Sequence, residues 1–99
     1  MRILTKSGSR YEIDERGIVK KYNSEGVGVD AFRVYVMKSV PKDVQNMQEV
    51  WDLPESEPEI GKLLYIGGKD GWWLSTEVVD IEPTGMWPHR AFRDTANGE

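Results

Sequence analysis

The side chains of this chain that could do chemistry or bind a partner are a Trp-Trp pair, a run of carboxylates, one histidine and a glycine-rich loop. The single histidine, His89, lies in a C-terminal stretch without sustained periodicity, whereas a general base needs a rigid support. The chain has no cysteine, which excludes thiol catalysis, disulfides and thiolate metal sites. Ser7 and Ser9 lack a neighbouring base and are typical of a turn. We therefore predict a protein that is not an enzyme.

No metal or cofactor site is predicted. The carboxylates between residues 49 and 59 lack the ordered glycine and the bidentate glutamate of a calcium loop; they are Glu49, Asp52, Glu55, Glu57 and Glu59. The glycine-rich segment 67–71 contains a lysine, as phosphate loops do. It leads into apolar, strand-like residues instead of a helix, so it predicts a hairpin turn.

Trp72 and Trp73 are the strongest candidates for binding a partner. Neighbouring residues on a strand point to opposite faces, so both rings cannot enter one core. The second ring is either covered by a helix near 41–53 or by the C-terminal segment, or it faces a partner beside Tyr35 or Tyr65. The predicted partner-binding residues are Trp72, Trp73, Tyr35, Tyr65 and Trp87, with the carboxylates of Glu55, Glu57 and Glu59.

The net charge of −4 is unevenly distributed along the chain. Residues 1–48 carry nine Lys or Arg against six acids, and residues 49–82 carry two against nine. The acidic half argues against nucleic acid as the main partner. No apolar run approaches the roughly 20 residues that span a bilayer, and a sheet that starts at residue 2 leaves no room for a signal peptide. We expect a cytoplasmic protein.

The first 22 residues predict three short strands over 2–6, 10–14 and 18–22, separated by tight turns. Residues 31–40 alternate in polarity, which predicts one fourth strand with Phe32, Val34 and Val36 on one face. The spacing of apolar residues then predicts a short helix over 42–51. An acidic, exposed connector follows at 54–59.

Two further strands, 62–66 and 72–82, are predicted on either side of the glycine-rich hairpin. A change of phase in the second of them predicts a bulge or bend near Val78. The expected fold is mainly β: a small, partly open barrel of five to seven antiparallel strands, SH3-like or similar, with one short helix. No internal repeat is apparent.

One domain is expected over residues 1–83. Residues 84–99 form a C-terminal tail that is either flexible or docked through Met86, Trp87 and Phe92. Docking on a second copy of the chain would make the protein a homo-oligomer.

Three segments of the chain carry a resemblance to a known group of proteins. The opening hairpin Thr5-Lys6-Ser7-Gly8-Ser9-Arg10-Tyr11-Glu12-Ile13-Asp14 and the later segments 61–64 and 75–82 resemble a group of short uncharacterised proteins encoded by phages of actinobacteria. These motifs cover strand and turn positions of about a third of the chain, without a catalytic residue. The resemblance implies a small β protein that works in the cytoplasm of a bacterial host.

The leading functional hypothesis is a non-enzymatic interaction module that binds a host protein. One alternative is an acidic mimic of nucleic acid, whose connector carboxylates occupy a groove on a host enzyme. A second alternative is a structural or self-assembling phage protein. The last is a small barrel that binds nucleic acid directly.

Overall fold

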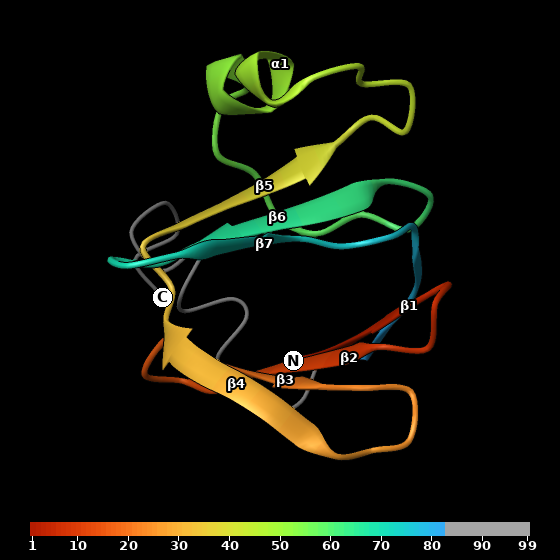
Figure 1. Cartoon of the computed structure of the whole chain (residues 1–99), viewed down its shortest axis with the longest axis vertical. Coiled ribbons are helices and arrows are strands. Elements are labelled where there is room, and N and C mark those ends of the chain that lie inside the picture. The colour runs from red at the N-terminus through yellow and green to blue at the C-terminus, as the bar shows by residue number, and fades with distance from the viewer. Residues whose placement is uncertain (83–99) are drawn as a thin grey trace, which may run out of the picture.

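The computed structural model describes residues 1–82, which form two antiparallel sheets packed face to face and one short helix (Figure 1). The five-stranded sheet has the order β4-β3-β2-β1-β8, made of β1 (Arg2–Thr5), β2 (Arg10–Ile13), β3 (Ile18–Tyr22), β4 (Gly28–Arg33) and β8 (Val78–Glu82). The three-stranded sheet has the order β5-β6-β7, made of β5 (Val36–Val40), β6 (Leu63–Gly67) and β7 (Trp72–Leu74). The mainly β class with one short helix is confirmed, while neither sheet closes into a barrel.

The described chain has eight strands instead of the predicted five to seven, because two expected long strands are each divided between the sheets. Within 31–40, the Val34 N–H donates to Gly17 O in the first sheet at 2.8 Å. The next residue, Tyr35, donates to Gly67 O in the second sheet, also at 2.8 Å. The chain therefore changes sheets between these two residues. The predicted common face of Phe32, Val34 and Val36 is wrong for the last of them: Phe32 and Val34 pack against the core between the sheets, whereas Val36 packs against the second apolar cluster and Met37 takes the core side.

The expected strand 72–82 changes sheets in the same way. Ser75 N–H donates to Leu64 O in the second sheet, whereas Lys6 N–H of the first sheet donates to Glu77 O. The irregularity predicted near Val78 is present, because the pairing of β1 with β8 shifts register between Leu4 and Thr5.

A nine-residue repeat, which the sequence analysis missed, builds the first three hairpins. Glycines at spacing nine, Gly8, Gly17 and Gly26, take φ values of 95°, 82° and 84°. Each glycine N–H donates to the carbonyl of the residue three positions earlier, at 2.9–3.0 Å. This left-handed position favours glycine, and it closes each hairpin with the same twist. In the sequence the repeat is marked only by the glycine and by the short polar residue three positions before it, which is Thr5, Asp14 or Asn23.

In two of these turns a side chain replaces a missing backbone partner. Asp14 Oδ1 accepts the N–H groups of Arg16 and Ile18 at 2.8 and 3.0 Å. Asn23 Oδ1 accepts the N–H groups of the residues two and four positions later at 2.9 and 3.0 Å. An Asp or Asn side chain can do this because it is short and carries an acceptor oxygen.

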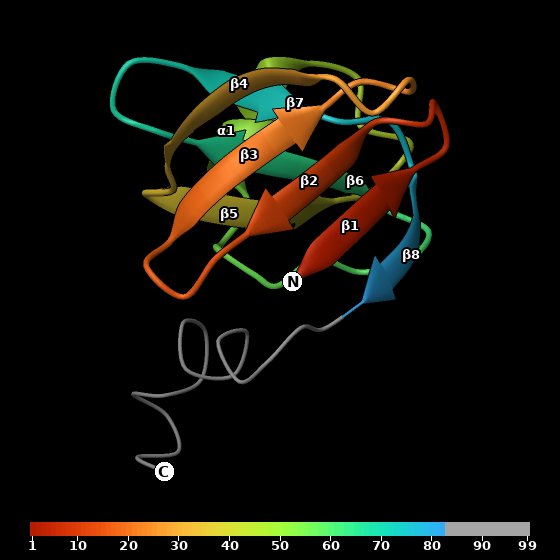
Figure 2. The same cartoon turned by 90° about the horizontal axis from the view of Figure 1, so that it is seen from below.

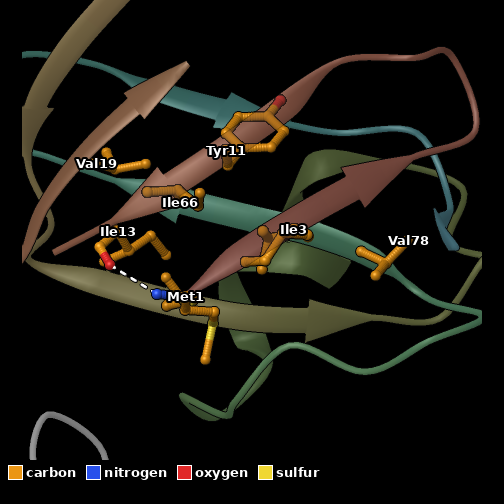
Figure 3. Packing of buried hydrophobic residues seen from close by; sticks show 9 residues of the cluster. Met1, Ile3, Tyr11, Ile13, Val19, Ile66 and Val78 are labelled. Carbon is orange, nitrogen blue, oxygen red and sulfur yellow. Dashed lines mark hydrogen bonds between the residues drawn. The ribbon is translucent and has the colours of Figure 1, made fainter. Parts of the chain in front are cut away.

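The main core lies between the two sheets (Figure 3). Its buried members are Met1, Ile3, Tyr11, Ile13, Val19, Met37, Leu64, Ile66 and Val78. Figure 3 shows Ile66 of the three-stranded sheet among side chains of β1, β2 and β3. At the margin of this core, the Met1 ammonium group donates to Ile13 O at 3.0 Å.

The helix α1 (Met47–Asp52) begins five residues later than the start of the predicted 42–51 helix. Asn46 caps it, since its Oδ1 accepts the Glu49 N–H at 3.0 Å. The segment after Pro41 forms a turn instead, with Val44 N–H donating to Pro41 O at 3.3 Å. In the described chain, no helix has the length and apolar character needed to cross a membrane.

The helix packs through Val50 against the face of the second sheet that points away from the main core, beside Val40 and Tyr65. A buried lysine binds the carbonyl groups at the C-terminal end of the helix. Lys38 Nζ donates to Val50 O at 3.1 Å and to Trp51 O at 2.8 Å. The same ammonium group lies 5.8 Å from the centre of the Tyr65 ring. The positive charge thus meets the negative end of the helix.

The connector is partly packed, contrary to the expectation that it would be exposed. Ser56 N–H donates to Met37 O at 3.0 Å, and Ser39 N–H donates to Ser56 Oγ at 2.8 Å. Pro58 is buried. The connector packs against the protein because its Ser56 forms hydrogen bonds with the edge of β5, where these backbone groups would otherwise lack partners. The expectations for His89 and for docking through Met86, Trp87 and Phe92 concern residues outside the described range.

Candidate functional site

A groove of about 540 Å³ opens where the edges of the two sheets meet. β4 is an edge strand of the larger sheet and β7 an edge strand of the smaller one, and both lie on the same side of the molecule (Figure 2). The groove is lined by residues 30–33 of β4, by Tyr35 at the sheet crossover, and by residues 69–73 of the second-sheet hairpin. A second hollow, lined by Met1 and by residues of β1, β2 and β3 that include Glu12, is smaller, at about 240 Å³.

Two stacked rings form the floor of the groove. The centres of the Phe32 and Trp73 rings lie 4.3 Å apart with an interplanar angle of 31°, and Trp73 also contacts the buried Tyr11 at 5.7 Å. Lys21 Nζ lies 5.5 Å from the Trp73 ring centre and 5.9 Å from that of Tyr11. Burial raises the pKa of the Tyr11 phenol. Trp73 is therefore fixed on both sides by neighbours of its own domain.

Two exposed rings stand at the rim. Trp72 retains 46% of its surface exposed and Tyr35 retains 61%. The Trp72 ring rests 5.9 Å from Tyr65, which is itself buried. Of the two rings, Trp73 packs against the main core and on Phe32, so Trp72 is the second ring. Its predicted cover by the C-terminal segment concerns residues outside the described range. Trp72 is the exposed ring, with Tyr65 beneath it and Tyr35 lining the same groove.

Four charged side chains also line the groove: Asp30, Arg33, Lys69 and Asp70. Asp30 Oδ1 accepts the Ala31 N–H at 2.8 Å, and Arg33 Nη1 donates to Arg16 O at 2.9 Å. Lys69 and Asp70 are exposed on the hairpin. Among residues 1–82, none of the four forms an ion pair.

The predicted connector carboxylates lie outside this groove. Glu55 is exposed and Glu57 is half-buried, while Glu59 forms an ion pair with Lys62 at 3.2 Å. Glu49 and Asp52 of α1 are exposed as well. Over the described part of the chain, no group of three or more His, Cys, Asp or Glu side chains could hold a metal ion.

The structure brings together Tyr35, Trp72 and Trp73, and it places Tyr65 under Trp72. Sequence reasoning missed Asp30, Phe32 and Asp70 as groove residues. Phe32 was expected in a long strand with Val34 and Val36, and the break between the sheets has no local signal. Trp87 lies beyond the described residues.

The chain was compared with protein-family models, with curated proteins and with solved structures, and none of the three comparisons finds a significant match.

Proposed function

We propose that this protein is a non-enzymatic interaction module whose groove between β4 and β7 binds a segment of another protein. The observation that carries the proposal is the pair of exposed rings, Trp72 and Tyr35, beside a floor of fixed rings. Exposed Trp and Tyr side chains are enriched among the residues that dominate binding energy at protein interfaces.

The two layers of rings would have different tasks. The Phe32–Trp73 stack is already held by Tyr11 and Lys21, so it provides a surface that needs no ordering when a partner arrives. Preformed surfaces bind more tightly because less conformational freedom is lost. Trp72 still has about half its surface to bury, and covering it with a partner would supply the anchor contact.

The likeness of the opening hairpin to proteins of actinobacterial phages makes a host protein the proposed partner, met in the host cytoplasm. This part of the proposal depends on the sequence motifs alone. The groove itself is compatible with any protein that offers a side chain to Trp72.

The test compares two tryptophans. Trp72→Ala and Trp51→Ala each remove an indole with about half its surface exposed, 46% and 50% respectively, but Trp51 belongs to α1. If the groove binds the partner, Trp72→Ala weakens binding by about 2 kcal/mol, or roughly thirtyfold. Trp51→Ala leaves it unchanged. Equal retention of the partner by both variants, with both folded by circular dichroism, would refute the proposal.

Acidic mimicry of nucleic acid is a second candidate, supported by the exposed carboxylates that gather on and around α1. Glu49, Asp52 and Glu55 are exposed there, whereas Glu59 is paired with Lys62. Replacing Glu49, Asp52 and Glu55 by Lys should abolish salt-sensitive binding to a host enzyme. Unchanged binding would remove this candidate.

A further inference from the structure

We infer that the groove selects a basic side chain, the guanidinium or ammonium group of an Arg or Lys in the partner, and holds it over Trp72. This inference rests on the proposed function and adds the chemistry of the partner. It follows from the rings, the carboxylates and the backbone that line the groove.

The rings of this protein already bind its own cations. Lys21 lies over Trp73 and Tyr11, Lys38 lies over Tyr65, and Arg10 lies 4.8 Å from the centre of the Tyr22 ring. Within residues 1–82, the rings of Trp72 and Tyr35 lack such a cation, although both are exposed at the groove. The negative face of an indole is the best side-chain surface for a cation.

The charges of the groove point the same way. Neither Asp30 nor Asp70 forms an ion pair in the described chain, so two carboxylates line the groove without a neutralising partner. Two cations line it as well, but the Arg33 guanidinium is bonded to Arg16 O at the β2–β3 turn. That bond directs the Arg33 guanidinium toward the turn but leaves its charge. Lys69, exposed on the hairpin, and Lys21, opposite Asp30 in the β3–β4 register and 5.5 Å from the Trp73 ring centre, are the other cations that compete with an incoming charge.

The backbone of β4 favours recognition through a side chain over addition of a strand. The Val34 N–H bonds to Gly17, so by alternation the backbone groups of Ala31 and Arg33 point away from β3. The Ala31 N–H is already taken by Asp30 Oδ1 at 2.8 Å. Gly68 is packed against Arg33 O, so closely that a Cβ there would lie 3.1 Å from that oxygen. These two contacts hinder the addition of a partner strand at this part of the edge.

The test titrates the full-length protein with three small probes: N-acetyl-arginine amide, its neutral isostere N-acetyl-citrulline amide, and the anionic N-acetyl-glutamate amide. The indole N–H resonances of the four tryptophans report binding by NMR. We expect the arginine probe to shift the Trp72 signal with a midpoint about fivefold below that of citrulline, the size of one exposed cation–π contact. The glutamate probe should leave the signal in place.

Charge-removing variants give the matched control. The double variant Asp30→Asn, Asp70→Asn should bind the arginine probe about fivefold more weakly than the unchanged protein. The control Asp80→Asn, at an exposed position of β8 outside the groove, should bind it equally well. A well-dispersed amide spectrum confirms that each variant is folded. Equal midpoints for arginine and citrulline, a Trp72 shift with glutamate, or indifference to the Asp30 and Asp70 changes would overturn the inference.

Failure of this inference can be told apart from failure of the proposed function. If Trp72→Ala loses the protein partner while the probes show no preference for a cation, the groove binds a protein by other chemistry. If Trp72→Ala keeps the partner, the proposed function itself is wrong.

Discussion

Replacing Lys38 by Met removes a charge that lies inside the protein while keeping the length of the side chain. Lys38 retains 8% of its surface exposed, and its ammonium group donates to Val50 O at 3.1 Å and to Trp51 O at 2.8 Å. It also lies over the Tyr65 ring. Met should fill the space of the alkyl stem but cannot donate to either carbonyl.

The size of the effect follows from what each carbonyl loses. Val50 O still accepts the Leu53 N–H at 3.2 Å, so it stays bonded. Trp51 O loses the shorter bond from Lys38, and it is only partly buried, so water can replace part of that contact. Hydrogen bonds to charged groups contribute about 1.5–3 kcal/mol. We therefore expect Lys38→Met to lower the free energy of unfolding by about 2 kcal/mol.

Urea unfolding followed by circular dichroism measures this change. In a thermal melt of a domain of this size, the same loss of about 2 kcal/mol corresponds to a fall in Tm of roughly 8–16 °C. The matched control is Lys42→Met, because the Lys42 side chain is 57% exposed and pairs with Glu77 at 3.3 Å on the surface. That change should stay within about 0.5 kcal/mol. If Lys38→Met is as stable as the control, the lysine does not stabilise the end of the helix.

Three further predictions concern the turns and the connector. Gly17→Ala should cost about 1–2 kcal/mol in a urea unfolding curve, because φ is +82° there although no atom obstructs the new Cβ; Gly71→Ala, equally unobstructed but without a positive φ, should cost less than half as much. Burial raises the pKa of Asp14, but the N–H donors of Ile18 and Arg16 outweigh this and hold it below 3.8, so its stabilisation is complete above that pH and is lost as pH falls through the depressed pKa. Asp14→Asn, which copies the Asn23 turn, should flatten this acid loss, and an identical pH profile of unfolding would contradict the assignment. Ser56→Ala should speed hydrogen exchange of the Ser39 amide, which donates to Ser56 Oγ, and unchanged exchange would show that the connector does not protect β5.

The first three strands could be predicted from the sequence because their signals are local. Alternating polarity and a glycine at each turn define a hairpin within about ten residues. The division of residues 31–40 could not be predicted, since Phe32, Val34 and Val36 alternate with other residues in the sequence, although Val36 packs in a different cluster and the hydrogen-bond partners change from Gly17 to Gly67. The partner of each backbone group is set by residues far away in the sequence.

Only part of the candidate site could be predicted, because the sequence shows local strand geometry but not which distant segments form one groove. Strand geometry alone separates the faces of Trp72 and Trp73, and the structure has one ring exposed and the other stacked on Phe32. Phe32 itself comes from a different sheet, about forty positions earlier in the chain. No spacing rule connects β4 with the second-sheet hairpin, so Asp30 and Asp70 could be assigned to one groove only from the fold.

The most direct test of the central claim is site-specific photo-crosslinking, in cells of the proposed bacterial host, with p-benzoylphenylalanine at Tyr35 and, separately, at Trp51. Both positions are exposed, but only Tyr35 lines the groove. We predict that the probe at position 35 crosslinks one host protein and that the probe at 51 does not. Crosslinking of the same protein with equal yield from both positions, or from position 51 alone, would contradict the claim that this groove is the binding site.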